Sequence, residues 1–123
     1  MIFWLIYAAL FVGFYYSQLA DAKVSQEGFR MGYSEGNEIA TFLFGPHPSS
    51  VQLEIVNLVQ LGVFLLPAVI WFPGAARDGW LVGFTVAAAG RHLMAVREWR
   101  EAFATNGASL IQGKTIWQKF LGL

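Results

Sequence analysis

The sequence predicts an all-α membrane protein with three transmembrane helices, a short interfacial helix in the first loop and a C-terminal amphipathic segment. Of its 123 residues, 56% are hydrophobic and only 13% are charged, which is more apolar surface than a domain of this size can bury in its own core. Three apolar runs approach or reach the roughly 20 helical residues that cross a hydrocarbon core. We therefore interpret residues 1–123 as a single integral membrane domain.

The first apolar run predicts a transmembrane helix over about residues 2–22. The tripeptide Ala20-Asp21-Ala22 loosely resembles a signal-peptide cleavage site. No Lys or Arg precedes the apolar run, however, so we expect the segment to be retained as a span. No Pro follows directly, and the helix is expected to continue as far as Gly32.

The first loop is expected to contain the short helix, over Glu38 to Phe44. Asn37 is a suitable N-cap for this helix because its side chain can accept hydrogen bonds from the first free backbone N–H groups. Gly45 and Pro46 follow the apolar residues and would end the helix. We place it at the membrane interface.

The second span is predicted over about residues 51–72. Ser49, with Gln52 three residues later, forms a capping box that opens this helix. Pro67 lies inside the apolar run and predicts a kink, because a proline cannot donate to the helical hydrogen-bond ladder.

The third span is predicted over about residues 79–97, on a helix that Asp78 would cap and that continues to about Ala104. Beyond it, residues 108–121 combine large apolar side chains with two lysines. This combination is typical of a helix that lies on the membrane surface.

Basic residues are distributed unequally between the two sides of this arrangement. If the first span runs from outside to inside, every Lys and Arg except Arg77 lies on the cytoplasmic side. Positive charge in short loops is strongly enriched on the cytoplasmic side of membranes. The distribution therefore predicts an external N-terminus and a cytoplasmic C-terminus.

Composition also limits the classes of ligand and partner that can be expected. The formal net charge is zero, which gives no reason to expect nucleic acid. Cysteine is absent, which excludes disulfides and Cys-ligated metals. Neither histidine stands in a His-x-x-x-His or Glu-x-x-His spacing, so we expect no metal and no cofactor. The expected partners are the lipid bilayer and other integral membrane subunits, or further copies of this chain.

Glu54 and Asn57 are the polar residues that stand out in the second span. An ionisable group at that depth needs a partner or water, because it is costly to leave in lipid. Arg91 and His92 lie at a similar level of the third span, and we expect Glu54 to pair with one of them. The pair would specify helix packing, although a proton-handling role for Glu54 and His92 stays open.

A second group of polar residues surrounds the first loop. Asp21, Glu35, Asn37 and His47 are expected to form one polar cluster that locks the loop to the helices, as caps and turn residues rather than as catalytic groups. No serine has a recognisable nucleophile elbow or a suitably placed base.

Small residues recur at helical spacing in two spans, where they would let helices approach closely. We expect this contact to form within the chain. The helix-packing residues are Ala9, Gly13 and Ser17 in the first span and Gly79, Gly83 and Ala87 in the third.

The polar residues of the first loop also resemble a motif, which reads Asp, then Gly-x-x-Glu-x-Asn, then Gly-x-His-Pro-Ser. Its residues are Asp21, Gly32, Glu35, Asn37, Gly45, His47, Pro48 and Ser49. The pattern is similar to that of an uncharacterised family of small bacterial multi-pass membrane proteins, in which a Pro follows the Asn where Glu38 stands here. The resemblance implies a three-span fold in the bacterial inner membrane and carries no activity with it.

Three classes of function remain open. We favour a non-catalytic accessory or assembly subunit of a larger integral membrane complex, because too few polar groups converge to form a catalytic site. A holin-like or channel-forming oligomer suits the small size, but no helix shows the sustained polar face of a water-lined pore. The third class is a proton- or metal-handling membrane enzyme that uses Glu54 and His92.

Overall fold

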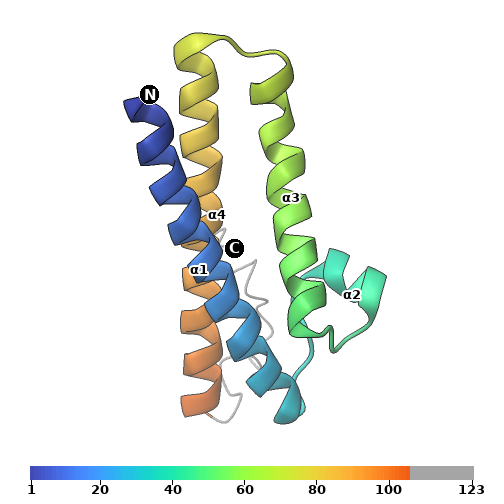
Figure 1. Ribbon diagram of the computed structural model, residues 1–123. Helices are drawn as coiled ribbons and strands as arrows, with labels where there is room; N and C mark the ends of the chain where they lie inside the picture. The colour runs from blue at the N-terminus through green and yellow to red at the C-terminus, as the bar shows by residue number, and fades with distance from the viewer. Residues whose placement is uncertain (106–123) are drawn as a thin grey trace.

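Four helices make up the part of the chain that the computed structural model describes, residues 1–105 (Figure 1). They are α1 (Ile2–Arg30), α2 (Glu38–Phe44), α3 (Ser50–Ile70) and α4 (Gly74–Ala104). By length and composition, α1, α3 and α4 can each cross a membrane. The structure therefore confirms the all-α fold with three candidate spans and a shorter helix in the first loop. The expected surface segment, residues 108–121, lies outside the described residues.

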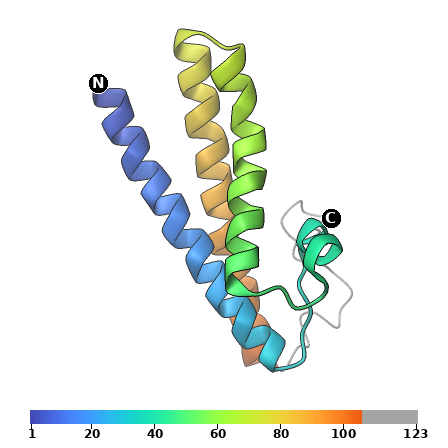
Figure 2. The ribbon, with the colours of Figure 1, turned by 45° about the vertical axis from the view of Figure 1, so that its right-hand side comes forward.

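The three long helices lie side by side, with α1 and α4 running in the same direction and α3 in the opposite one (Figures 1 and 2). The N-terminus and the α3–α4 turn lie at one end, which carries Arg77 and is called the Arg77 end here. The ends of α1 and α4 lie at the opposite, basic end, where the sequence places Lys23, Arg30, Arg97 and Arg100. The bundle thus separates the basic residues as the sequence predicts.

Helix α1 continues without a break from its apolar part to Arg30, as the absence of a proline predicts. Gly32 then ends it with a positive φ of 95°. Close to this end, Gly28 lies against the ring of Trp99 on α4. A Cβ atom at Gly28 would lie 2.3 Å from that ring, so only glycine permits this approach of the two helices.

Helix α2 begins and ends where the sequence predicts. The Asn37 side chain accepts hydrogen bonds from the backbone N–H groups of Ile39 and Ala40, at 3.0 and 3.3 Å. Gly45 ends the helix with a φ of 83°. Both cap residues therefore act through the local chemistry that was expected of them.

The sequence placed α2 at the membrane interface and did not predict that it lies beside α3. Its cap residue Asn37 donates a side-chain hydrogen bond to Gln60 (3.2 Å). Gln60 lies ten residues beyond Ser50, the first residue of α3, which corresponds to about 15 Å along the helix. Helix α2 therefore turns back beside the lower part of α3 and does not lie beyond its end, as both views show.

Helix α3 opens with the predicted capping box. The Ser49 side chain accepts from the backbone of Gln52 (3.2 Å), and the Gln52 side chain accepts from the backbone of Ser49 (2.9 Å). The helix runs through Pro67 to Ile70. Trp80 on α4 then donates its indole N–H to the carbonyl of Phe64 (2.7 Å) and ties α3 to α4 near the Arg77 end.

The expected start of α4 at Asp78 is wrong. The helix begins at Gly74, and its N-cap is Pro73, five residues before the expected cap. A proline is favourable at a helix start because its missing N–H has no helical partner there. Asp78 lies inside the helix, where its carboxylate accepts a hydrogen bond from Arg77 (3.2 Å).

The small-residue stripes, which were expected to pack within the chain, do so only in part. In α1, Ala9 and Gly13 are exposed, and only Ser17 is buried. All three residues of the second stripe, Gly79, Gly83 and Ala87, are exposed on α4. The facing sides of α1 and α4 instead carry larger buried side chains, which include Phe14, Gln18, Thr85 and His92.

Candidate polar site at the basic end

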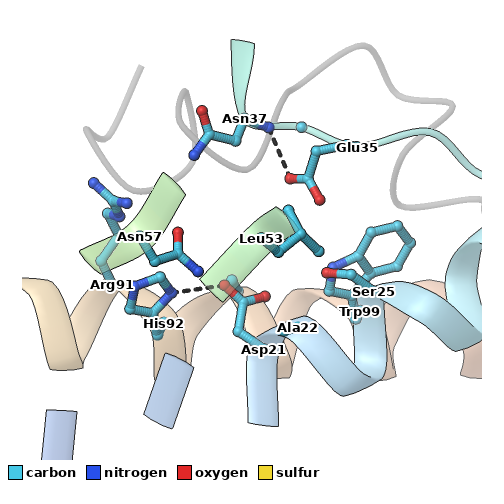
Figure 3. A pocket seen from close by; sticks show the side chains of 12 residues that line it. Asp21, Ala22, Ser25, Glu35, Asn37, Leu53, Asn57, Arg91, His92 and Trp99 are labelled. Atoms are coloured by element: carbon cyan, nitrogen blue, oxygen red, sulfur yellow. Dashed lines mark hydrogen bonds and ion pairs between the residues drawn. The ribbon is translucent and has the colours of Figure 1, made fainter. Parts of the chain in front are cut away.

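Side chains from four segments surround a small cavity between the helices near the basic end (Figure 3). Its volume is about 40 Å³, which is room for roughly three water molecules. Its polar lining consists of Asp21, Ser25, Glu35, Asn37, Asn57, Arg91 and His92. Six of the eight residues that the sequence singled out therefore lie in one place, and Glu54 and His47 do not.

Asp21 and His92 form the closest polar contact of this site. The His92 Nδ1 atom lies 2.7 Å from the Asp21 carboxylate, and the imidazole side chain is 3% exposed. Its ring also packs against Phe14, with 5.7 Å between the ring centroids. This contact joins α1 to α4 and holds the histidine ring in one orientation.

Glu54 was expected to pair with Arg91 or His92, and the His92 alternative is wrong. Glu54 accepts a hydrogen bond from the Tyr15 hydroxyl (3.0 Å), and His92 is held by Asp21. Glu54 precedes Asn57 by three residues, which turns its side chain by roughly 60° around α3. The rotation directs Glu54 toward α1, while Asn57 lines the cavity.

His47 also lies outside the cavity. Its side chain is exposed, and its ring lies 5.4 Å from that of Phe29, measured between centroids. The neighbouring Pro48 is buried, and its carbonyl accepts a hydrogen bond from the Gln26 side chain (2.8 Å). This part of the loop is therefore anchored by Pro48 and not by the histidine.

Glu35 reaches the cavity from the segment between α1 and α2. Its Oε1 atom accepts a hydrogen bond from the backbone N–H of Asn37 (2.8 Å). Its Oε2 atom is buried and has no hydrogen-bond partner among residues 1–105. Burial raises the pKa of Glu35 from 4.5 to about 7, helped by the nearby carboxylate of Asp21 and opposed by the N–H groups of Asn37 and Gly36.

Gln18 is a buried polar residue of the site region that the sequence reasoning missed. It is fully buried, and its carbonyl oxygen accepts a long hydrogen bond from Asn57 (3.5 Å). Its amide nitrogen has no partner within the described part of the chain. A Gln inside an apolar run is a signal that could have identified it, because polar residues in spans usually face the bundle interior.

Arg91 lies at a boundary between two environments. It lines the polar cavity together with Asp21, and it also lines a larger cavity of about 210 Å³ whose other walls are mostly apolar. Phe64 of α3 and Phe84 of α4 line this second cavity. Toward the Arg77 end, α3 carries no polar side chain from Leu61 to Ile70, and α1 and α4 are joined there by a hydrogen bond between Tyr7 and Thr85 (3.0 Å).

The arrangement can hold water and exchange protons between carboxyl and imidazole groups. Within residues 1–105, no group of three or more His, Cys, Asp or Glu side chains is placed to hold a metal ion. Comparisons with protein-family models, curated proteins and solved structures find no match for this chain.

Proposed function

We propose that this chain is a non-catalytic accessory or assembly subunit of a larger integral membrane complex. The observation that supports this proposal is the exposed stripe of Gly79, Gly83 and Ala87 on α4. A Cβ atom at Gly79 or Gly83 would meet no atom of the described chain within 4 Å. Small residues at this spacing let a second helix approach closely in lipid, and at Gly79 and Gly83 no other helix of the described chain takes up this space.

The stripe of α1 lies at a similar depth. Gly13 follows Ile2, the first residue of α1, by eleven residues, and Gly83 follows Gly74, the first residue of α4, by nine. These separations correspond to about 16 and 14 Å along the helices. Two neighbouring parallel helices therefore both expose small residues in the same layer of the bilayer, which favours a partner helix at that level.

The polar site also supports a structural role for this chain. Its Asp21–His92 contact joins α1 to α4, and its Asn37–Gln60 contact joins the first loop to α3. Toward the Arg77 end, α3 has no polar side chain from Leu61 to Ile70. Within the described chain, α3 therefore offers no polar lining at this end, which argues against a pore through one copy.

We place the basic end in the cytoplasm and the N-terminus outside, in a bacterial inner membrane. The support is the enrichment of Lys and Arg at that end, together with the resemblance of the first-loop motif to small bacterial membrane proteins. The lipid bilayer is the partner of the remaining apolar surface.

Native mass measurement after extraction in a mild detergent tests the proposed function. We expect the chain to be recovered with a distinct membrane subunit at fixed stoichiometry, and this association should be lost in Gly83→Leu. Gly62→Leu is the matched control, because Gly62 is also exposed and open, but on α3. A large homo-oligomer would instead support the channel alternative, and a monomer unaffected by Gly83→Leu would contradict the proposal.

A further inference from the structure

The segment from Met31 to Gly45 folds back beside α3 (Figures 1 and 2). Gln60, which accepts a hydrogen bond from the Asn37 side chain, lies about 15 Å along α3. Glu35, Gly36 and Asn37 line the cavity from this segment.

Tyr33 holds the start of this segment against α4, with its ring centroid 5.8 Å from that of Trp99 and 6.4 Å from that of Phe103. The backbone N–H of Glu35 donates to the carbonyl of Pro46 (2.9 Å) within the same loop. Ala40 is the one buried residue of α2, and it packs against Ala22, Leu53 and Val56. Phe42 on the opposite side is 87% exposed. Beyond Tyr33, the segment also contacts the bundle through Asn37, Ala40 and the groups that face the cavity.

Glu35 is the group of the segment whose charge matters most for docking. Asp21 faces it from α1, and Arg91 and His92 line the same cavity from α4. From α3, the lining residues are Leu53 and Asn57, which do not titrate. Glu38 of α2 is exposed.

The ionised form of Glu35 is poorly accommodated in the docked position. Its Oε2 atom is buried without a partner among residues 1–105, and the nearby Asp21 carboxylate is already bonded to His92. A buried charged oxygen without a partner is costly. A protonated Oε2 removes the charge and can donate to water in the cavity.

We propose that the cavity is a proton-binding site, at which Glu35 takes up a proton from water when residues 31–45 dock and returns it when they undock. The site is independent of the proposed partner contact, because the small-residue stripe of α4 lies toward the Arg77 end. Proton uptake and docking are then linked: each favours the other.

The direction of the pH dependence follows from the raised pKa of Glu35. In the docked state this pKa is about 7, against 4.5 for an unperturbed glutamate. Docking is therefore strongest below pH 4.5 and weakens as the pH rises through about 7. Between these two pKa values, each pH unit changes the docking equilibrium by up to about tenfold.

Thiol labelling in lipid vesicles tests this proposal, because the chain has no cysteine of its own. A Cys introduced by Ala40→Cys is buried when the segment is docked, and one introduced by Ser34→Cys is exposed in the same segment. The ratio of their maleimide labelling rates cancels the pH dependence of the thiol reaction. We expect this ratio to rise at least tenfold between pH 5 and pH 9, with a midpoint near 7.

Two variants separate the role of Glu35 from a general effect of pH. Glu35→Gln should keep the ratio low and independent of pH, and Glu38→Gln, which removes an exposed acid three residues away, should leave the wild-type profile unchanged. Hydrogen exchange of the amides of residues 35–41 in the unmodified chain gives the same test if Ala40→Cys disturbs packing. A flat wild-type profile, or an unchanged profile in Glu35→Gln, would overturn the proposal.

Discussion

Replacing Gly28 by alanine tests the closest helix contact of the structure. A Cβ atom at this position would lie 2.3, 2.7 and 2.8 Å from three ring atoms of Trp99. Ordinary van der Waals contact begins at 3.4 Å, so the two groups must separate by at least 1.1 Å (3.4 minus 2.3). Trp99 is 4% exposed and packs against Phe29 and Phe103, which leaves its ring little room to move.

The magnitude follows from two opposing effects. Overpacking a well-filled contact costs about 1–3 kcal/mol, and alanine in place of glycine inside a helix gains about 1 kcal/mol. Gly13→Ala supplies the control, because a Cβ at Gly13 meets nothing within 4 Å in the described chain. This variant therefore has the gain in helix propensity without the overpacking. We therefore expect Gly28→Ala to be less stable than Gly13→Ala by about 1–3 kcal/mol.

Equilibrium unfolding by SDS in mixed micelles, followed by the helical circular-dichroism signal, measures this difference. Both variants contain the same change from glycine to alanine in the same helix, so propensity cancels in the comparison. If the two variants unfold at the same SDS fraction, α1 and α4 do not make the contact that positions Asp21 against His92.

Two further predictions concern the first loop and the topology. Asn37→Ala removes the cap of α2 and the bond to Gln60, and should lower the free energy of unfolding by about 1 kcal/mol in the same micelle assay, whereas wild-type stability would show that the cap is not formed. A reporter fused to the N-terminus should read external and one fused to the C-terminus cytoplasmic; reversal of both would contradict the assigned orientation.

Local signals in the sequence predicted most of the secondary structure. Asn37, Gly45 and Ser49 act through neighbours within a few residues, so their roles as caps and terminators can be derived from sequence alone. The predicted start of α4 was wrong because two local signals compete. Pro73 precedes Asp78 and takes the N-cap position. A sequence does not show which of two adjacent starts the tertiary contacts will favour.

The pairing within the site could not be derived in the same way. Predicting that Asp21 bonds His92 requires knowing that α1 and α4 are neighbours along their length, which no local signal shows. The partner of Glu54 depends on the rotation of α3 about its axis, and a three-residue step separates a side chain facing Tyr15 from one lining the cavity. The outward direction of Gly79 and Gly83 likewise depends on the rotation of α4 about its axis, which the sequence does not show.

Site-specific photo-crosslinking along α4 in native membranes tests the proposed lateral packing most directly. A photoreactive residue placed singly at each position from Gly79 to Gly90 reports which face of the helix contacts another protein. We predict adducts with one membrane subunit that are strongest at Gly79, Gly83 and Ala87 and weak between them, with the 3.6-residue period of a helix. A profile without this period, or adducts of equal strength from Gly62 on α3, would contradict the proposal.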